Sequence, residues 1–435
     1  MHFNNAARSR ANGYHRFLAL FLLGFLAITA RVNQAQAEGF SLYDYGARGS
    51  SLGGAMMARK PDPSAVAHNP ALITQLPGST IMAGFTAIGI SGDILWSEGG
   101  RSGRTSVHHS IYTIPHAYFT RQLSQDWFLG IGEFSRFGLG NEYPSDWPGR
   151  FNVYEVYLLS ASLNPVIAYK ATDKLSLAAG VELLYASLSM KNRISLVPGV
   201  AEVDARIEKA DDLGIGFNLA AHYRFNDQWS IGLHYRSPVR IEAKGKMYFS
   251  YLGPDISQIT DSYAARFKDG IVKGTVTLPE SIALGVAYNL SEKTSLELGL
   301  TWTRWSRYQS LNFELPGNLP PSINPKHWQD TWRVTFGVER VLNDWLDLRV
   351  GFNWTESPMT TNNADYTVPT NDRLTYTLGL GFHNDSFSLD VAYILVDCRS
   401  RSFNSSPLPN GNGTLKSKSQ SYMAHEGALS LTYHF

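Results

Sequence analysis

The sequence predicts an all-β membrane protein, an antiparallel transmembrane β-barrel of about fourteen strands. Apolar and polar side chains alternate over long segments, and the connections between those segments alternate between tight turns and long loops. Beyond the N-terminus the chain has no apolar run of 20 residues, which excludes helical membrane spans. Barrel strands stay possible, because their lipid-facing and lumen-facing residues average out along each strand.

The segment 213–225 shows the alternation most clearly. Every odd position from Leu213 to Phe225 is apolar or aromatic, whereas the even positions are small or polar and include His222 and Arg224. This is the period of a β-strand, and the segment exceeds the roughly 9–11 residues that a tilted transmembrane strand needs. The same pattern recurs at the last residues, where Leu429, Leu431, Tyr433 and Phe435 alternate with polar neighbours.

About fourteen strand-like segments follow one another from Ser79 onwards. They lie near residues 79–90, 111–121, 126–137, 153–170, 174–193, 211–225, 228–242, 275–289, 293–305, 331–341, 345–355, 372–383, 386–397 and 422–435. Their connections alternate between tight polar turns (123–125, 171–173, 226–227, 290–292, 342–344 and 384–385) and long loops (91–110, 138–152, 194–210, 243–274, 306–330, 356–371 and 398–421). This sorting, with an even strand number, is typical of an outer-membrane barrel.

Charged residues fix the register of the strands. Arg333 and Arg349 fall on the face opposite to the apolar side chains, so a one-residue slip would move each arginine into lipid, at roughly 2–4 kcal/mol near the midplane. Asp347 and Glu339 share that inner face and can pair with the arginines. We expect this set to form a structural network in the lumen rather than a substrate contact.

The N-terminus reads as a secretory signal peptide, residues 1–37. Three arginines precede the apolar run 17–30, and Ala35-Gln36-Ala37 supplies a small-x-small cleavage site. A short N-terminal anchor is the alternative. Removal of 1–37 takes away four of the 38 basic residues and none of the 37 acidic ones, leaving a net charge of about −3 without a basic block. Nucleic acid is therefore not an expected partner.

The next segment, residues 38–78, does not alternate. It holds several glycines, the turn-rich stretch 60–64 and then Ala67-His68-Asn69-Pro70-Ala71. We expect a compact, irregular segment with short helices, which needs a place to pack before the barrel proper, residues 79–435.

The third strand-like segment loses its phase. Its outward-facing positions begin with the apolar Trp127, Leu129 and Ile131, but the next outward position is the charged Glu133. The aromatic Phe134 falls on the opposite face of the strand. A bulge or kink near Glu133–Gly138 would re-aim the chain. The alternative is that the strand has left the bilayer at this point.

At Asn69-Pro70-Ala71-Leu72-Ile73-Thr74 the chain resembles the FadL/TodX family of outer-membrane transporters for hydrophobic compounds. The likeness covers essentially the whole chain after residue 37. The other motifs that carry it, in order, are Gly39-Phe40, Trp147-Pro148-Gly149-Arg150, Tyr235-Arg236-Ser237-Pro238-Val239, Leu278-Pro279-Glu280, Trp305-Ser306, Asp330-Thr331-Trp332-Arg333, Ser357-Pro358, Asp372-Arg373 and the terminal Phe435.

The resemblance implies a 14-stranded barrel whose lumen is plugged by an N-terminal hatch, residues 38–78. It places the hatch motif Asn69, Pro70 and Ala71 beside a kinked third strand, where the wall opens sideways and the ligand leaves into the membrane. Glu133, Phe134, Phe137 and Gly138 are then the residues of this lateral opening. The loop 194–210 is shorter than the family's fatty-acid transporters usually carry, which counts against an outer capture groove.

The resemblance implies uptake of hydrophobic compounds, with long-chain fatty acids expected as substrates and aromatic or alkane hydrocarbons as the alternative. A carboxylate head group needs a cation. The candidates are Lys191, Arg193, Arg304, Arg307 and Lys326, and exposed rim charge is the alternative role for each.

Two other classes of protein, a general porin and a membrane hydrolase, share parts of this pattern. A general porin is disfavoured because residues 38–78 would block it. An outer-membrane lipase or esterase would need a strained nucleophile turn near the lumen histidines, and the sequence has none. We expect no catalytic residue, metal or cofactor: Cys398 is the only cysteine, and His108-His109 lacks neighbouring ligands. The expected partners are a hydrophobic small molecule, outer-membrane lipid and lipopolysaccharide, and the expected state is a monomer.

Overall fold

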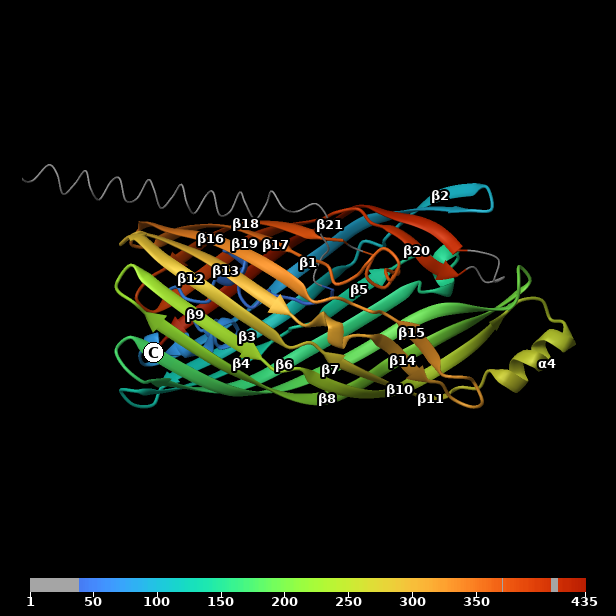
Figure 1. The fold of residues 1–435 in the computed structure, drawn as a ribbon, viewed down its shortest axis with the longest axis horizontal. Coiled ribbons are helices and arrows are strands. Elements are labelled where there is room, and N and C mark those ends of the chain that lie inside the picture. Colours follow the sequence, from blue (N-terminus) through green and yellow to red (C-terminus); the bar gives the residue numbers. More distant parts are fainter. Residues whose placement is uncertain (1–38, 370, 408–413) are drawn as a thin grey trace, which may run out of the picture. The chain divides into compact units, whose positions relative to one another are not determined.

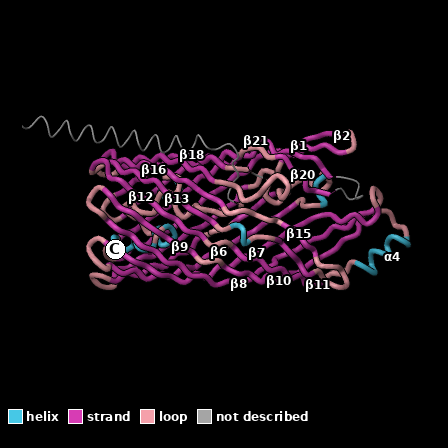
Figure 2. The backbone as a smooth tube through the Cα atoms, in the orientation of Figure 1, coloured by secondary structure: helices cyan, strands magenta, loops and turns pink. Residues whose placement is uncertain are grey.

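The computed structural model describes residues 39–369, 371–407 and 414–435. These residues form one compact unit, a barrel of tilted strands around a filled lumen (Figures 1 and 2). The predicted signal peptide lies outside the described residues. In the described part of the chain, no helix combines the length and apolarity that crossing a membrane requires.

The wall is a closed barrel of fourteen antiparallel strands, as predicted. Several wall strands are interrupted, so the structure contains more segments than wall strands. The continuous ones are β1 (Ser79–Glu98), β3 (Ile111–Gln122), β6 (Glu155–Lys170), β7 (Leu175–Val197), β8 (Ala201–Arg224), β17 (Leu346–Thr355), β18 (Arg373–His383) and β21 (Thr414–His434). The interrupted or extended ones are β4 and β5 (Trp127–Phe134, Gly138–Glu142), β9 and β10 (Trp229–Arg236, Val239–Leu252), β11 and β12 (Gly270–Leu278, Ser281–Ser291), β13 and β14 (Thr294–Thr303, Ser310–Glu314), β15 and β16 (Ser322–Pro325, Thr331–Asn343), and β19 and β20 (Phe387–Cys398, Ser402–Pro407).

The first and last strands close the barrel. β1 pairs with β21 from Thr80↔His434 up to Ser97↔Lys416, and on its other side β1 pairs with β3. The tight turns and the C-terminus lie at one end of the barrel, and the α4 helix (Ser257–Arg266) and the β2 strand (Arg101–Ser106) extend from the other (Figure 1). Because short turns face the periplasm in bacterial barrels, this arrangement orients the molecule.

The predicted register is confirmed by the exposure of the side chains. On β8, Ile215 is 69% exposed on the outer surface, whereas Asn218 on the inner face is fully buried. Arg349 is 3% exposed inside the lumen, where it bonds to Glu339 at 2.7 Å and to Asp347 at 3.1 Å. The expected lumen network is therefore present. Arg333 differs, because its guanidinium donates to the Gly53 carbonyl and lies over the Tyr43 ring instead.

Three of the predicted long loops are largely strand. β7 and β8 continue through most of residues 194–210 and leave only a short turn at 198–200. β1 and β2 occupy most of 91–110, and β20 with the start of β21 occupies most of the described part of 398–421. β10 also continues into the predicted loop 243–274, as far as Leu252. Above the membrane the outer face of these strands is polar, so the sequence resembles a loop. The inner positions nevertheless alternate: Val203, Ala205 and Ile207 pack in an apolar cluster with residues of β10 and β14.

The hatch fills the lumen with three short helices, α2 (Ala47–Ser51), α3 (Ala65–His68) and the 3₁₀ helix η1 (Pro70–Gln75). Two further 3₁₀ helices, η2 (Pro148–Phe151) and η3 (Trp305–Arg307), lie in outer connections. The hatch is fastened to the wall by Glu297 of β13, whose carboxylate accepts the backbone N–H groups of Met57, Ala58 and Arg59 at 2.6–3.0 Å. Arg48 of α2 makes a bidentate pair with Glu339 at 2.8 and 2.9 Å.

Candidate transport site

The third wall strand is interrupted between β4 and β5, at residues 135–137. The backbone of this short segment bonds to the hatch: Leu42 N–H donates to the Arg136 carbonyl at 2.8 Å, and Gly138 N–H donates to the Phe40 carbonyl at 2.9 Å. Ser41 and Phe137 form an isolated bridge. The interruption therefore joins the wall directly to the start of the hatch.

Side chains on the interior hold the interruption in place. Arg136 donates to the fully buried Glu182 of β7 at 2.8 Å. The Ser160 hydroxyl donates to the Phe137 carbonyl at 2.7 Å and accepts from the Phe137 N–H at 3.0 Å. Sequence reasoning missed these partners, although a basic residue directly after the phase break was a possible signal.

The four residues expected at the lateral opening lie around this interruption. Glu133 is half-buried and pairs with Ala117 in the last paired position of β3 and β4. Phe134 is fully buried and packs edge-on against Tyr45 of the hatch, with ring centroids 5.1 Å apart. Phe137 is buried against Phe40, and Gly138 begins β5.

A window in the wall lies above the interruption. β3 and β4 pair only from Ala117↔Glu133 downwards, and β5 pairs with β6. The upper half of β3, residues 111–116, pairs with β1 and has no ladder to β5. The window is closed at its top, where His108 N–H donates to the Glu142 carbonyl at 2.8 Å.

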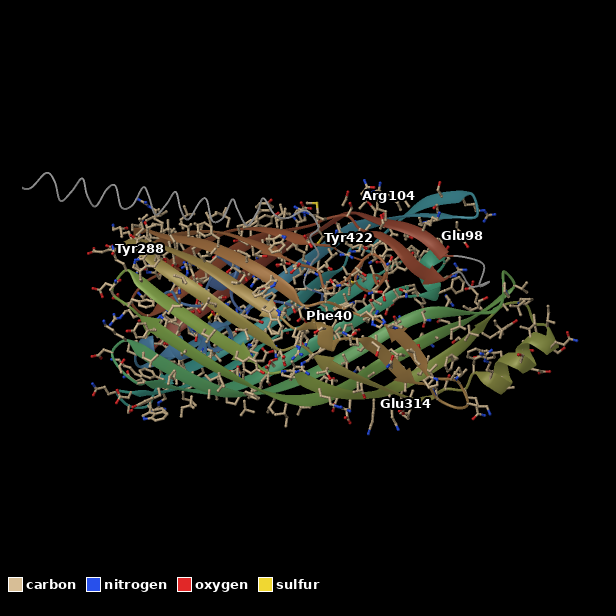
Figure 3. The ribbon with its side chains drawn as sticks, in the orientation of Figure 1. Phe40, Glu98, Arg104, Tyr288, Glu314 and Tyr422 are labelled. Atoms are coloured by element: carbon tan, nitrogen blue, oxygen red, sulfur yellow. The ribbon has the colours of Figure 1, made fainter. Side chains whose placement is uncertain are left out.

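A cavity of about 380 Å³ fills this window, and we call it the window cavity. On the lipid-facing side it is lined by Ile111 and Leu159, which are 78% and 60% exposed. On the lumen side it reaches the buried Phe40 and Tyr422, both of which are labelled in Figure 3. An apolar path thus runs from the hatch to the outer surface of the wall.

A second apolar cavity, the outer cavity, lies between β6, β7, β10, β11 and β14 and has a volume of about 80 Å³. It shares Phe40, Leu139, Leu158 and Val368 with the window cavity. Phe40 packs edge-on against Trp305 at 4.8 Å and Tyr308 at 5.6 Å. The ring of Phe40 therefore stands in the partition between the two cavities.

The hatch motif lies at the lower part of the lumen, where all three of its residues are buried. Asn69 Nδ2 donates to the Met57 carbonyl at 2.7 Å and to the Ala221 carbonyl of β8 at 3.2 Å, and its Oδ1 accepts the Ala71 N–H at 3.1 Å. Pro70 begins η1, a position that needs no N–H donor. Asn69 thus caps η1 and joins two parts of the hatch to the wall.

Each expected head-group cation lies in an ion pair. Lys191 contacts Glu155 at 2.7 Å, and Arg193 contacts Asp204 at 3.4 Å. Arg304 and Arg307 share Glu280 at 3.0 and 2.9 Å, and the buried Lys326 bonds to Asp365. Within the described residues, none of the five lines the window cavity or the outer cavity.

The cation that does line the window cavity is Arg373 of β18, which sequence reasoning quoted in a motif but did not assign to binding. Its Nη2 donates to the Gly39 carbonyl at 2.9 Å. Glu426 lines the same cavity and contacts Asp44 of the hatch. The polar end of the window cavity is thus shared between the wall and the hatch.

Burial shifts the pKa values of ionisable groups in the hatch and the outer loops. Burial raises the pKa of the Asp44 carboxyl above its ordinary value. Burial lowers the pKa of His68 to about 4, which leaves the ring neutral. Burial also acts to raise the pKa of Asp365, but the Lys326 ammonium holds it below its ordinary value. Among the described residues, no group of three or more His, Cys, Asp or Glu side chains is placed to hold a metal ion.

The fold and the site together define a plugged outer-membrane barrel with an apolar route to its own wall. A family model described as outer membrane protein transport protein (OMPP1/FadL/TodX) matches residues 28–435. The chain belongs to this family and is an outer-membrane protein that transports hydrophobic compounds.

Named relatives agree with this assignment. A long-chain fatty acid transport protein of Escherichia coli O6:H1 is 24% identical, over 86% of this chain and 90% of the relative. Outer membrane protein P1 of Haemophilus influenzae is 23% identical, over 76% and 79%. These relatives are transporters or outer-membrane proteins rather than enzymes, so the hydrolase alternative finds no support among them.

Solved structures share the fold. A Pseudomonas aeruginosa FadL homologue superposes with a TM-score of 0.82 at 18% identity, covering 91% of this chain and all of that chain. The Pseudomonas putida toluene transporter TodX superposes with a TM-score of 0.68 at 18% identity, covering 91% and 99%.

Proposed function

We propose that the protein takes up long-chain fatty acids and releases them sideways through the window beside β5. The observation that carries this proposal is the window cavity, which connects Phe40 at the hatch with Ile111 and Leu159 on the lipid-facing surface. Burial of an acyl chain of about fifteen methylenes is worth roughly 12 kcal/mol before entropic costs. Two cavities divided by Phe40 offer successive weaker stations, so that the ligand can leave again.

Two features favour a fatty acid over a hydrocarbon. Arg373 brings a cation to the window cavity, and a carboxylate is the ligand group that a guanidinium recognises. Relatives at 24–25% identity bear the name long-chain fatty acid transport protein. The competing function, uptake of aromatic or alkane hydrocarbons, is favoured by the apolar lining of the rest of the path.

The proposal assigns roles to the residues singled out above. Asn69, Pro70 and Ala71 hold the lower hatch, while Glu133, Phe134, Phe137 and Gly138 shape the window. Movement of Phe40 with the segment 39–45 opens the partition between the cavities. The five paired cations are structural in this scheme, and Arg373 receives the head group.

The protein acts as a monomer whose outer surface contacts lipopolysaccharide. Lys418 of β21 is exposed and lies at the register position of Leu95 on β1, above the lipid-facing belt, whereas Arg104 on the other side of Leu95 bonds to Asp93. Lys416 is exposed on the same face of β21. Phosphate groups of lipopolysaccharide are the anions available at this height.

Competition binding tests the substrate class. Purified protein carrying radiolabelled palmitate is challenged with unlabelled palmitate, toluene or a long alkane. We expect palmitate to displace the label at concentrations at least tenfold below those of the other two. Equal or stronger displacement by toluene or the alkane would transfer the proposal to the hydrocarbon alternative.

A further inference from the structure

Three arginine side chains border a small polar cavity between the hatch and the wall, which we call the lumen cavity. It has a volume of about 60 Å³. The arginines are Arg136 of the interruption, Arg236 of β9 and Arg333 of β16, and each is only 4–6% exposed. Tyr45 and His68 of the hatch line the cavity as well. Among its lining residues, all of which belong to the described part of the chain, there is no aspartate or glutamate.

A single carboxylate forms ion pairs with this group of arginines. Glu182 contacts Arg136 at 2.8 Å and Arg236 at 3.4 Å. Within residues 39–369, 371–407 and 414–435, Arg333 forms no ion pair, and Asp44 attracts it only through space. Three buried guanidinium groups and one paired carboxylate leave a surplus of two positive charges at the lumen cavity.

The guanidinium groups also keep unused hydrogen-bond donors. A guanidinium carries five N–H donors, but Arg333 makes one hydrogen bond to the described residues, from Nη2 to the Gly53 carbonyl at 3.0 Å. Arg136 and Arg236 donate through their Nη atoms and leave Nε without a described partner. None of these unpaired nitrogen atoms is sealed off by packing. They therefore face the polar space around the hatch.

The surplus charge and the open donors together call for an anion. A buried charge is costly unless an opposite charge compensates it, and water can supply acceptors but no charge. A cavity that holds one water molecule needs roughly 10–15 Å³. At about 60 Å³ the lumen cavity has room for an ion of the size of chloride with one or two waters, but not for an acyl chain.

We propose that the lumen cavity binds a small monovalent anion of the size of chloride, with Arg333 as its principal ligand and with Arg236 and Arg136 supplying further positive charge. Because hatch residues line one part of the cavity and β16 another, the bound anion joins the hatch to the wall and stabilises the seated hatch. The inference goes beyond the proposed function and does not depend on the substrate class.

Anomalous diffraction from bromide tests the site directly. Crystals of the full chain are soaked in sodium bromide, because bromide replaces chloride and can be identified by its anomalous signal. We expect a peak in the lumen cavity, in contact with the guanidinium group of Arg333. A cavity that holds only water, or bromide bound only at exposed cations such as Arg304, would overturn the inference.

Thermal unfolding tests what the anion does. The melting temperature of the purified chain is measured in sodium chloride and in sodium gluconate of equal ionic strength, since gluconate is too large for the cavity. We expect chloride to raise the melting temperature by about 2 °C, with saturation, and Arg333→Met to abolish this rise.

Arg304→Met is the matched control. It also removes a guanidinium, but Arg304 is paired with Glu280 at 3.0 Å and does not line the lumen cavity. We expect this variant to keep the response to chloride. An equal rise in the natural chain and in Arg333→Met would show a general salt effect on the surface and would count decisively against the site. Should Arg333→Met fail to fold, the bromide experiment on the natural chain decides alone.

Discussion

At the residue scale, Arg136 anchors the interruption of the third wall strand to the interior of the barrel. It is the middle residue of the interrupting segment 135–137, and its guanidinium bonds to Glu182 of β7, the strand next to β6. Arg236 approaches the same carboxylate at 3.4 Å, and the Ser162 hydroxyl donates to it at 2.7 Å. A carboxylate this deeply buried depends on all of its partners.

Replacing Arg136 by methionine leaves Glu182 under-compensated, since one partner of a buried ion pair is lost. We expect Arg136→Met to destabilise the barrel by about 3 kcal/mol, and the double variant Arg136→Met with Glu182→Gln to recover part of that loss. Thermal unfolding, followed by the heat-dependent mobility of the barrel on gels, measures both. Additive losses in the double variant would contradict a coupled pair.

Asp372, at the outer end of β18, makes the free energy of unfolding depend on pH. Burial raises the pKa of this carboxyl to about 7, above its ordinary 3.8. The folded state therefore binds the proton more tightly than the unfolded state. The stabilisation of the folded state by the protonated carboxyl is complete below about pH 4 and is lost as the pH rises through 7. We expect the melting temperature to fall between pH 5 and pH 9, and to fall less in Asp372→Asn. Parallel slopes in the two proteins would count against this assignment.

At the element scale, the strands could be predicted because lipid and lumen impose opposite demands on alternate residues. The phase break at Glu133–Gly138 was visible for the same reason, since it violates that alternation. The outer extensions of β7, β8 and β10 were not recognised, because above the membrane their outer face is polar. The ion pairs of the outer loops could not be predicted, unlike the lumen network around Arg349: Lys326 and Asp365 lie 39 positions apart in separate loops.

The window between β3 and β5 can be closed with a single side chain. A Cβ at Gly138 would lie 2.5 Å from the Leu42 side chain, and the rest of a leucine would enter the window cavity. We expect Gly138→Leu to reduce uptake of labelled fatty acid in whole cells at least fivefold while the barrel is still assembled.

Gly427→Leu is the control for this variant. Gly427 lies exposed on β21, and nothing stands within 4 Å of a Cβ built there. This variant adds the same side chain to the wall without entering the window, so uptake should match that of the natural chain. If both variants transport normally, the sideways route is wrong.

At the scale of the whole molecule, the barrel and the hatch are joined by buried polar contacts rather than by apolar packing alone. Glu297 holds three backbone N–H groups of the hatch, and Glu339 bridges Arg48 of the hatch and Arg349 of the wall. The closed wall followed from the sequence pattern. The plug was implied by the family resemblance. Its fastening required the coordinates, because the contact of Met57 with Glu297 and that of Arg48 with Glu339 each join residues more than 200 positions apart.

These contacts predict how tightly the lumen is sealed. With the hatch fastened, we expect the natural chain to conduct ions far less than a general porin in a planar bilayer. Glu297→Ala combined with Glu339→Ala leaves hatch N–H groups without acceptors and three arginines, Arg48, Arg59 and Arg349, under-compensated. At about 3 kcal/mol for each site, the hatch should loosen and porin-like openings should appear. Glu314→Ala, which removes an exposed acid from the outer surface, should stay closed. Large conductance in the natural chain, or a double variant as silent as the control, would show that these carboxylates do not hold the plug.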